Sequence, residues 1–305
     1  MSTQAWTVAA MPGQQGRVAI VTGANCGIGF EQARALTAKG ASVVIACRTP
    51  AKGDDARRRI LAEVPQGDVR VMSIDTADLA SVRRFAEQFK KEFSRLDLLI
   101  NNAGVMAIPK QLSVDGFELQ LATNHLGHFA LTGLLLPLLE ATPGSRVVAV
   151  SSLAARRGQI HFDDLTMGDR YKPWPAYEQS KLANLIFGLD LHRRLQRAGS
   201  KVVAVAAHPG VSKTNLFSTP GDPLRKKLGS MLLPFMFQPA AQGAVAANKI
   251  GTAPSIRGGE FIGPDRFGEF RGAPKLAWVT PTARNEETAR KLWEVSEQLT
   301  GVGYL

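Results

Sequence analysis

The segment Arg17-Val-Ala-Ile-Val-Thr22, followed by Gly23-Ala-Asn-Cys-Gly-Ile-Gly29, decides the fold of this chain. The first six residues form a β-branched, apolar run that predicts a buried strand, and a helical pattern follows the turn. Glycines at such a junction allow a tight turn and let backbone N–H groups approach a pyrophosphate, whose charge the helix N-terminus stabilises. Three glycines alone are weak evidence, because structural turns often contain as many. The strand–turn–helix context favours nucleotide binding.

Short β-branched runs alternate with helix-length segments through the rest of the chain. The expected strands cover residues 17–22, 42–47, 69–74, 96–100, 146–150, 201–206 and 259–263. The expected helices cover residues 27–39, 51–64, 78–93, 113–140, 176–198, 239–250 and 285–300. The first six strands are apolar at nearly every interior position, which is typical of strands covered by helices on both faces. The alternation predicts an α/β fold: a single Rossmann-type, doubly wound domain with about seven parallel strands.

Length and composition agree with one large globular domain. A chain of 305 residues with 45% hydrophobic and 21% charged residues is neither disordered nor fibrous. We expect a flexible tail over residues 1–15 and one domain over 16–305, in which the irregular region 212–238 is a candidate substrate loop. The most apolar runs, 129–139 and 228–237, are far shorter than the ~20 residues of a membrane span. We therefore expect no signal peptide and no integral membrane association.

The basic residues are in excess but do not form one cluster. There are 37 Lys and Arg against 26 Asp and Glu, a formal net charge of +11 that could serve nucleic acid, a membrane surface or an anionic substrate. They form scattered pairs in expected helices, such as Arg83-Arg84, without the interleaved aromatic residues of a single-strand binder. Solvated helix faces are the favoured interpretation, and nucleic acid is not an expected partner. The two cysteines, Cys26 and Cys47, are too few for a disulfide scaffold, which predicts a cytoplasmic location.

The glycine spacing resembles that of the short-chain dehydrogenase/reductase family, whose pattern is TGxxxGIG. Residues 22–29 meet every fixed position of that pattern, and five further motifs follow in the family's order, each at its expected place relative to a strand or helix. These motifs are Asn101-Asn102-Ala103-Gly104, Asn124, Ser151-Ser152, Tyr177-x3-Lys181 and Pro209-Gly210. The resemblance spans about residues 16–300 and implies an oxidoreductase that uses a nicotinamide dinucleotide.

Tyr177 and Lys181 also support catalysis through simple physical chemistry. Residues four apart on a helix share a face, so the Lys181 ammonium can lie near the Tyr177 hydroxyl. A nearby cation favours phenolate and lowers the tyrosine pKa from ~10 toward neutrality. We therefore expect Tyr177 to be a usable general acid or base. An isolated Tyr-x3-Lys would more simply be a surface pair, but Ser152 at a strand end and the glycine turn favour the catalytic interpretation.

The resemblance implies roles for four catalytic residues. Ser152 would donate a hydrogen bond to a substrate carbonyl while Tyr177 gives its oxygen a proton and the nicotinamide supplies hydride, and alcohol oxidation is the reverse. Lys181 would also hold the nicotinamide ribose, and Asn124 would support a water that reconnects Lys181 with solvent. Of the two adjacent serines, Ser151 is expected to shape the strand end.

Cofactor choice depends on the residue at the end of the second strand. That residue is Arg48, whose guanidinium suits a 2′-phosphate and would leave the ribose diol of NAD without an acidic partner. NADP(H) is therefore the expected cofactor. NAD(H) remains the alternative, because Asn25-Cys26 stands in the glycine turn where many NADP-using relatives place a basic residue. Asp75 matches the family position that contacts adenine, whereas Asn101-Asn102 could equally be a turn that supports the sheet.

The resemblance implies a full set of cofactor-binding positions. They are Gly23, Asn25, Cys26, Gly27, Ile28, Gly29, Arg48, Asp75, Thr76, Asn102, Ala103, Gly104, Tyr177, Lys181, Pro209, Gly210, Val211 and Thr214.

Four segments are most similar to the retinol dehydrogenase-like branch of the family: Ala46-Cys47-Arg48, residues 124–129, residues 180–184 and His208-Pro209-Gly210. That branch handles apolar ketones, aldehydes and alcohols. The lipophilic stretch from Leu216 to Phe237 could serve as a lid for such a substrate. It could equally pack against the body of the protein or against a second subunit.

Two further expectations concern the surroundings of the site. The separation of 25 positions between Ser152 and Tyr177 is wider than in compact family members, so an extra loop containing Asp163, Asp164 and Trp174 is expected to border the site. His125 and His128 lie three apart on a helix, but no third ligand is adjacent in sequence, and packing or hydrogen bonding is favoured over a metal site.

The last expectations concern assembly and catalysis. Family members commonly self-associate through the helices that here contain Asn124 and Tyr177, so a dimer or tetramer is expected. A dinucleotide-binding regulator without turnover is the alternative to an enzyme. The intact set of Ser152, Tyr177 and Lys181 favours the enzyme, because a sensor has no chemical need for it.

Overall fold

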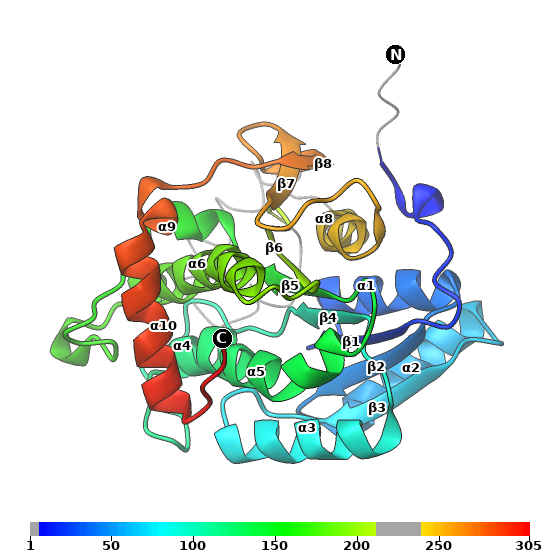
Figure 1. Cartoon of the computed structure of the whole chain (residues 1–305), viewed down its shortest axis with the longest axis horizontal. Coiled ribbons are helices and arrows are strands. Elements are labelled where there is room, and N and C mark those ends of the chain that lie inside the picture. The colour runs from blue at the N-terminus through cyan, green and yellow to red at the C-terminus, as the bar shows by residue number, and fades with distance from the viewer. Residues whose placement is uncertain (1–5, 212–238) are drawn as a thin grey trace, which may run out of the picture.

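Strands from across the chain form one sheet in a computed structural model that describes residues 6–211 and 239–305. Within these residues, eight strands lie in the order β3-β2-β1-β4-β5-β6-β7-β8 (Figure 1). Their bounds are β1 Val18–Thr22, β2 Ser42–Cys47, β3 Val69–Ser73, β4 Leu98–Asn101, β5 Arg146–Val150, β6 Val203–Ala207, β7 Phe261–Arg266 and β8 Arg271–Leu276. The first seven pair in parallel, and the strand order reverses between β1 and β4. Such a reversal opens a crevice at the carboxyl ends of the strands.

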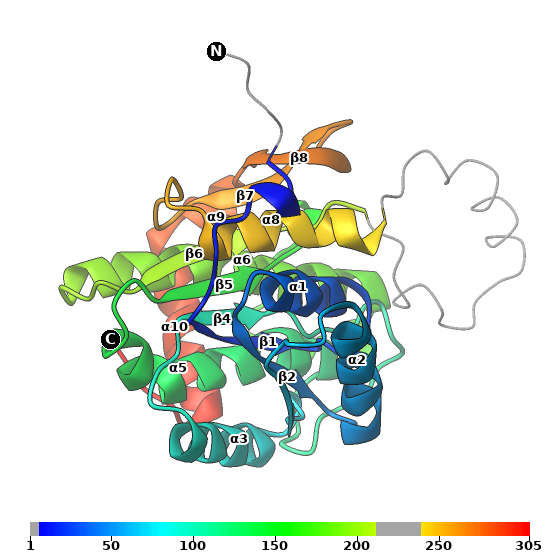
Figure 2. The ribbon, with the colours of Figure 1, turned by 90° about the vertical axis from the view of Figure 1, so that its right-hand side faces the viewer.

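Helices cover both faces of this sheet. Their bounds are α1 Gly27–Ala38, α2 Pro50–Glu63, α3 Leu79–Glu92, α4 Leu119–Leu121, α5 Gly127–Glu140, α6 Pro173–Arg197, α8 Ala240–Thr252, α9 Pro281–Arg284 and α10 Glu286–Thr300. Short turns are η1 Val8–Ala10, the π-helical η2 Ala122–Leu126, η3 Leu153–Arg156 and η4 Gly168–Arg170. Successive strand residues point to opposite faces. Val18 and Ile20 of β1 pack with α3, α5 and α6, whereas Ala19 and Val21 pack with α1, α2 and α8. Figure 2 shows the two layers of helices.

The predicted doubly wound α/β fold is confirmed, with one strand more than expected. β8 returns antiparallel to β7 and forms the edge of the sheet. Its sequence, Arg-Gly-Ala-Pro-Lys-Leu, has a proline and a glycine and lacks β-branched residues, so it carries no strand signal. Proline is tolerated there because an edge strand can leave an N–H position unpaired.

The long helix expected over 113–140 is wrong at its start. Residues 113–117 form a turn in which the Ser113 N–H donates to the Phe117 carbonyl at 2.7 Å and Gly116 has φ +83°. Helical structure begins at Leu119, after the Glu118 carboxylate accepts hydrogen bonds from the N–H groups of Gln120 and Leu121. A capping carboxylate satisfies N–H groups that the first turn leaves open. The helix over 176–198 instead starts earlier, at Pro173, a position that proline favours.

The described part of the expected tail lies against the domain. Met11 is 2% exposed and packs in the core that contains α1, and the Gln14 N–H donates to the Lys39 carbonyl at 2.8 Å. Residues 6–15 are therefore attached, contrary to the expectation of a loose segment. Residues 1–5, the expected substrate loop 212–238 and Thr214 lie outside the described residues.

α10 lies across α5 and α6, at the left of Figure 1. Trp293 of α10 packs edge-on against Phe129 of α5 at 5.0 Å between ring centroids, and stacks on Phe187 of α6 at 6.0 Å. Aromatic pairs at such distances contribute about 1 kcal/mol each beyond their buried area. The face of α5 and α6 is thus covered by the chain's own last helix.

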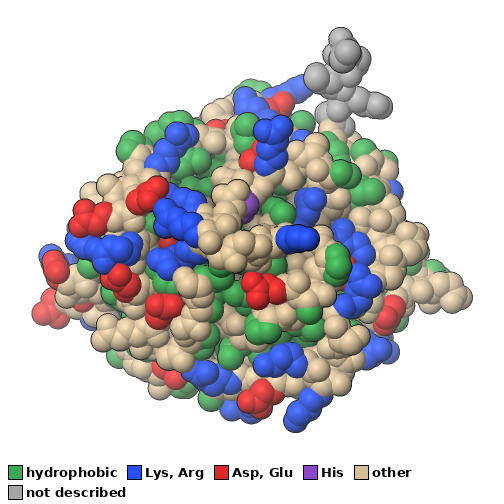
Figure 3. Space-filling view, in the orientation of Figure 1, with side chains coloured by type: hydrophobic (Ala, Val, Ile, Leu, Met, Phe, Trp, Pro, Cys, Tyr) green, Lys and Arg blue, Asp and Glu red, His purple; other side chains and the backbone are tan. Residues whose placement is uncertain are grey.

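Charged side chains are mixed over the face shown in Figure 3, with Lys and Arg beside Asp and Glu. Pairs one helical turn apart are frequent, for example Arg290 with Glu294 at 2.7 Å. This pattern fits solvated helix faces. Among the helices in the described part of the chain, none is both long and apolar enough to cross a membrane.

Candidate active site

A cleft of about 490 Å³ opens where the strand order reverses, at the carboxyl ends of the central strands. The predicted cofactor residues that line it are Gly23, Asn25, Cys26, Gly27, Ile28, Gly29, Arg48, Asp75, Thr76, Asn102, Ala103, Gly104, Tyr177, Lys181 and Pro209. Ala46, Cys47 and Ser151, which the sequence did not assign to the cofactor, also line it, as do Ile74, Val105, Thr123 and Val150. Gly210 and Val211 directly follow Pro209. The fold therefore brings these fifteen positions, from six separate segments of the chain, to one cleft.

The glycine turn brings backbone close to backbone at the base of the cleft. Gly23 has φ +68°, and its N–H donates to the Ala46 carbonyl at 2.7 Å. A Cβ on Gly29 would lie 2.6 Å from both Asn102 Nδ2 and the Gly23 carbonyl oxygen, so only glycine fits there. The side chain of Cys26 makes no capping hydrogen bond at the start of α1 within the described structure. The open N–H groups of this helix end are suited to a phosphate.

Thr22 and Asn102 join the glycine turn to the turn after β4. Thr22 Oγ accepts hydrogen bonds from the Asn102 and Ala103 N–H groups at 2.8 and 2.9 Å, and Asn102 Nδ2 donates to the Thr22 carbonyl at 2.8 Å. Asn102 thus has the structural role that the sequence left open, and it also lines the cleft beside Ala103 and Gly104. Its contacts hold two walls of the cleft together.

His128 supports the same junction. Its Nδ1 lies 2.9 Å from the Asn124 carbonyl, which can only accept, so Nδ1 carries the proton and Nε2 accepts from Thr22 Oγ at 2.9 Å. Burial lowers the pKa of His128 to about 4, which keeps the ring neutral at physiological pH. His125 instead contacts Ser296 of α10 at 2.9 Å. The two rings serve packing and hydrogen bonding, and no group of three or more His, Cys, Asp or Glu suited to a metal is found in residues 6–211 and 239–305.

Tyr177 and Lys181 lie one turn apart on α6 and are both buried. Lys181 Nζ is 5.9 Å from the centroid of the Tyr177 ring and donates to the Val150 carbonyl at 3.1 Å. Burial lowers the pKa of Lys181 to about 8. Burial also raises the pKa of Tyr177, although a hydrogen bond with Ser152 opposes that rise. The expectation that Lys181 would lower this tyrosine pKa is therefore wrong for this structure, because desolvation of the phenolate has the larger effect.

The two serines after β5 have different partners. Ser151 is 2% exposed, and its hydroxyl donates to the Lys181 carbonyl at 2.6 Å, which fixes α6 to the strand end. Ser152 precedes η3, and its oxygen accepts from the Ala154 N–H at 3.2 Å. Ser152 also hydrogen-bonds Tyr177, and this contact lowers the tyrosine pKa against the effect of burial. Ser151, and not Ser152, is among the residues that line the cleft, so the roles expected for the two serines stay predictions.

Asn124 lies in the π-helical turn η2, an irregularity that often marks functional sites. Its Oδ1 accepts from the Val105 N–H at 2.8 Å, and its Nδ2 donates to Ser180 Oγ at 2.8 Å. A Cβ on Gly104 would lie 3.0 Å from Asn124 Oδ1 and 3.4 Å from Lys181 Nζ. The glycine therefore sits where Asn124 and Lys181 approach each other.

Arg48 and Asp75 lie at the outer end of the cleft. Arg48 Nη1 is 3.9 Å from Asp75 Oδ2, and the Arg48 side chain is 74% exposed. Such a loose surface contact contributes little to stability and leaves the guanidinium available to a ligand. The Asp75 carboxylate also accepts from the Ala77 N–H at 2.9 Å, which orients it.

Trp174, which was expected in a loop bordering the site, lies in the first turn of α6. Its ring meets the Tyr177 ring edge-on at 6.0 Å and is 47% exposed. His208 and Glu269, discussed below, meet behind Pro209 although 61 positions separate them. Sequence reasoning could not pair these residues, because β8 carried no strand signal.

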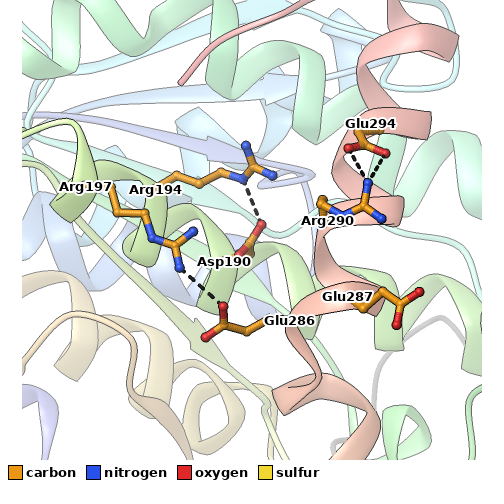
Figure 4. Close-up of a pocket in the computed structure, with 7 residues that line it drawn as sticks. All are labelled: Asp190, Arg194, Arg197, Glu286, Glu287, Arg290 and Glu294. Carbon is orange, nitrogen blue, oxygen red and sulfur yellow. Dashed lines mark hydrogen bonds and ion pairs between the residues drawn. The ribbon is translucent and has the colours of Figure 1, made fainter.

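A second hollow, of about 450 Å³, lies between α6 and α10 (Figure 4). Its charged side chains pair with one another: Asp190 with Arg194, Arg197 with Glu286, and Arg290 with Glu294. The fourth carboxylate, Glu287, pairs with Lys291 at 3.0 Å, so each acidic side chain of the lining already has a basic partner, and we assign this hollow to helix packing.

Comparison with known proteins agrees with the geometry of the cleft. The family described as short chain dehydrogenase matches residues 17–222. Human retinol dehydrogenase 12 is 42% identical over 287 residues, which cover 94% of this chain and 87% of that protein. The crystal structure of an uncharacterised protein from Mycobacterium paratuberculosis is 42% identical, with a TM-score of 0.83 and coverage of 99% of this chain and 100% of the other.

A complex of Pseudomonas aeruginosa RhlG with NADP is 26% identical, with a TM-score of 0.65 and coverage of 82% of this chain and 94% of that one. The family match covers more than half of the chain, and five of the six motifs quoted for the resemblance contribute residues to the cleft; Asn124 does not line it. The chain belongs to the short-chain dehydrogenase family of oxidoreductases.

Proposed function

We propose that this oxidoreductase uses NADP(H) to interconvert a lipophilic carbonyl compound and its alcohol, with Tyr177 as the general acid and base. The observation that carries the proposal is that Tyr177 and Lys181 line the same cleft as the glycine turn and Arg48, while Ser152 hydrogen-bonds Tyr177. When bound, the nicotinamide would supply or accept the hydride.

The residues of the cleft fit such a cofactor. The glycine turn and the uncapped start of α1 offer backbone N–H groups for a pyrophosphate, and Gly29 lets α1 pack closely on that turn and on Asn102. Arg48 is exposed, and a guanidinium can bind a 2′-phosphate with two parallel hydrogen bonds. RhlG, a relative at 26% identity, is described in complex with NADP. The alternative, preference for NAD(H), would leave Arg48 without a ligand group.

Each catalytic residue would act on the substrate oxygen or on the proton that it exchanges. Ser152 donates a hydrogen bond to the carbonyl oxygen, and Tyr177 gives that oxygen a proton, or removes it from an alcohol. Because burial holds the Tyr177 pKa high, its hydroxyl is protonated at neutral pH and ready for the reductive direction. Lys181 carries a labile charge, since burial lowers its pKa to about 8, and Asn124 lies beside it to support proton return.

The relatives suggest the substrate class. Human retinol dehydrogenases 12 and 14 are 42% and 37% identical to this chain. Trp174 offers an apolar, partly exposed ring directly beside Tyr177, which suits a lipophilic substrate. We propose apolar ketones, aldehydes and alcohols as the substrates.

The function is tested by replacing Tyr177 with Phe. This variant keeps the ring and its packing but loses the proton, so we expect turnover of a lipophilic carbonyl panel with NADPH to fall by ~10²–10⁴-fold. NADPH affinity, followed by intrinsic fluorescence, should change little. A protein that binds NADPH but transfers no hydride to any member of the panel, with no effect of Tyr177→Phe, would instead be the dinucleotide-binding regulator.

A cytoplasmic homo-oligomer completes the proposal. Because α10 covers α5 and α6, an interface on this side would have to include the outer surface of α10. A dimer or tetramer is the expected state.

A further inference from the structure

His208 is buried between β6 and the Pro209-Gly210 turn, and its two ring nitrogens have different partners. The Gly210 N–H donates to Nδ1 at 3.2 Å, so Nδ1 must be the unprotonated nitrogen. The proton of the neutral ring is then on Nε2, which donates to Glu269 Oε2 at 2.9 Å. Burial lowers the pKa of His208 although Glu269 opposes this, so the ring is neutral at physiological pH. The Glu269 carboxylate thus selects the tautomer that can hold Gly210.

Glu269 binds two further groups with the same carboxylate. Arg156 Nη2 lies 2.6 Å from Oε2, and the Trp278 N–H donates to Oε1 at 3.1 Å. The Glu269 side chain is 13% exposed, and burial alone would raise its pKa. His208, Trp278 and Arg156 together outweigh burial and lower the pKa, so the group stays ionised. Charge-assisted hydrogen bonds of this kind are about twice as strong as neutral ones.

The hairpin between β7 and β8 presents Glu269 in a backbone conformation that side chains rarely adopt. Its φ is +71°, and Phe267 two residues earlier has φ +53°. Strained residues persist where surrounding contacts hold them, often near functional sites. The hairpin also contacts the turn directly, because the Val211 N–H donates to the Phe270 carbonyl at 2.9 Å. A Cβ on Gly263 would overlap the His208 ring, so the hairpin backbone packs closely on the imidazole.

Two functional turns meet at this carboxylate. Arg156 is the last residue of η3, the turn that begins directly after Ser152, and His208 precedes Pro209, which lines the cleft. We propose that Glu269 is a positioning residue, which holds the Ser152 turn through Arg156 and the Pro209-Gly210 turn through His208 at a fixed separation across the cleft. This inference rests on the proposed function, in which Ser152 contacts the substrate and Pro209-Gly210 contacts the cofactor.

The first test needs no turnover. Nitrogen-15 NMR of the side-chain imidazoles in the full-length protein, with the His208 signal assigned by its loss in His208→Gln, reports the tautomer directly. We expect the Nε2–H form in the wild type. The Nδ1–H form, or a mixture of the two, would overturn the inference even if the protein proved to be an active reductase.

The second test separates positioning from folding. Glu269→Gln keeps the side-chain shape but removes the charge that Arg156 and His208 share, so we expect kcat to fall by at least ~10-fold and the NADPH dissociation constant, followed by intrinsic fluorescence, to rise. The matched control is Glu294→Gln, which removes the exposed partner of Arg290 on α10 and should change neither quantity. Thermal unfolding of both variants checks that the fold is retained.

Two further variants distinguish the contacts of the ring. His208→Asn retains an acceptor near the position of Nδ1 for Gly210, whereas His208→Gln retains reach toward Glu269 but loses that acceptor. We expect NADPH affinity to be rescued better by Asn than by Gln. If Arg156 and Glu269 act as one unit, Arg156→Gln combined with Glu269→Gln should lower kcat no further than Glu269→Gln alone.

The outcomes distinguish failure of this inference from failure of the proposed function. An active wild type whose kcat and NADPH affinity are unchanged in Glu269→Gln would refute the positioning role alone. A wild type that neither binds NADPH nor transfers hydride would refute the proposed function. The tautomer measurement would then decide whether the contact between Glu269 and His208 exists.

Discussion

Replacing Lys181 with Met should make the protein more stable while removing its activity. Lys181 is 5% exposed, and burial lowers its pKa from the usual 10.5 to about 8. At about 1.36 kcal/mol for each pKa unit, holding the charged amine in the folded protein at pH 7 costs about 3 kcal/mol. The Val150 carbonyl would keep a partner in the variant, since Asn184 Nδ2 also donates to it at 3.2 Å. Allowing ~1 kcal/mol for the lost hydrogen bond, we expect a net gain of about 2 kcal/mol.

The sign of the pH dependence identifies the cause. Below pH 8 Lys181 is protonated in both the folded and the unfolded protein, so the folded wild type bears the full cost of burying the charged amine. Between pH 8 and 10.5 the folded amine has lost its proton while the unfolded one keeps it, so wild-type stability rises with pH on account of this group. The variant lacks that rise. Its advantage should therefore shrink by about 2 kcal/mol between pH 7 and 9.5.

Urea unfolding, followed by tryptophan fluorescence at pH 7.0, 8.5 and 9.5 in the absence of nucleotide, gives the free energies of unfolding. Measurements stop at pH 9.5 because burial raises the pKa of Tyr177 in the folded protein. At higher pH the tyrosine ionises first in the unfolded chain, which lowers the stability of both proteins. Lys201→Met, at an exposed position before β6, is the control and should change stability by less than ~0.5 kcal/mol. A Lys181→Met protein no more stable than wild type at pH 7, or an advantage that does not change with pH, would refute the reasoning.

Four other outcomes follow from the same geometry. Wild type should bind NADPH at least ~10-fold more tightly than NADH in fluorescence titrations, and Arg48→Ala should abolish the difference; equal affinities in wild type would reverse the cofactor assignment. Gly29→Ala should lower thermal stability and NADPH affinity, because its Cβ would lie 2.6 Å from two polar atoms, whereas Gly303→Ala, with its nearest neighbour at 3.7 Å, should not. Trp174→Ala should raise KM for apolar carbonyls more than it lowers kcat, and an unchanged KM would remove Trp174 from the substrate site. Light scattering after size exclusion should find a dimer or tetramer, and a protein that is monomeric at all concentrations would contradict assembly.

Much of the fold follows from local patterns in the chain. Apolar β-branched runs separated by helix-length segments predict a parallel sheet, because only strands covered on both faces can be apolar throughout. The boundaries were wrong where a single residue changed the local conformation, as Gly116 does before α4. β8 was missed because an edge strand with Pro and Gly is stabilised by its pairing with β7 and not by its own propensity.

The sequence by itself determined the positions of the glycine turn, of the Tyr177–Lys181 pair and of the strand that precedes Arg48, because each of these patterns lies within one strand, one turn or one helix. Only the tertiary structure decided the protonation of the site and its outer supports. Burial raises the Tyr177 pKa against the expected effect of Lys181, because desolvation depends on every element packed around the ring. Glu269 reaches His208 across 61 positions through a hairpin whose conformation the rest of the sheet imposes. Contacts between residues so far apart in the chain are fixed by packing, which a local pattern does not encode.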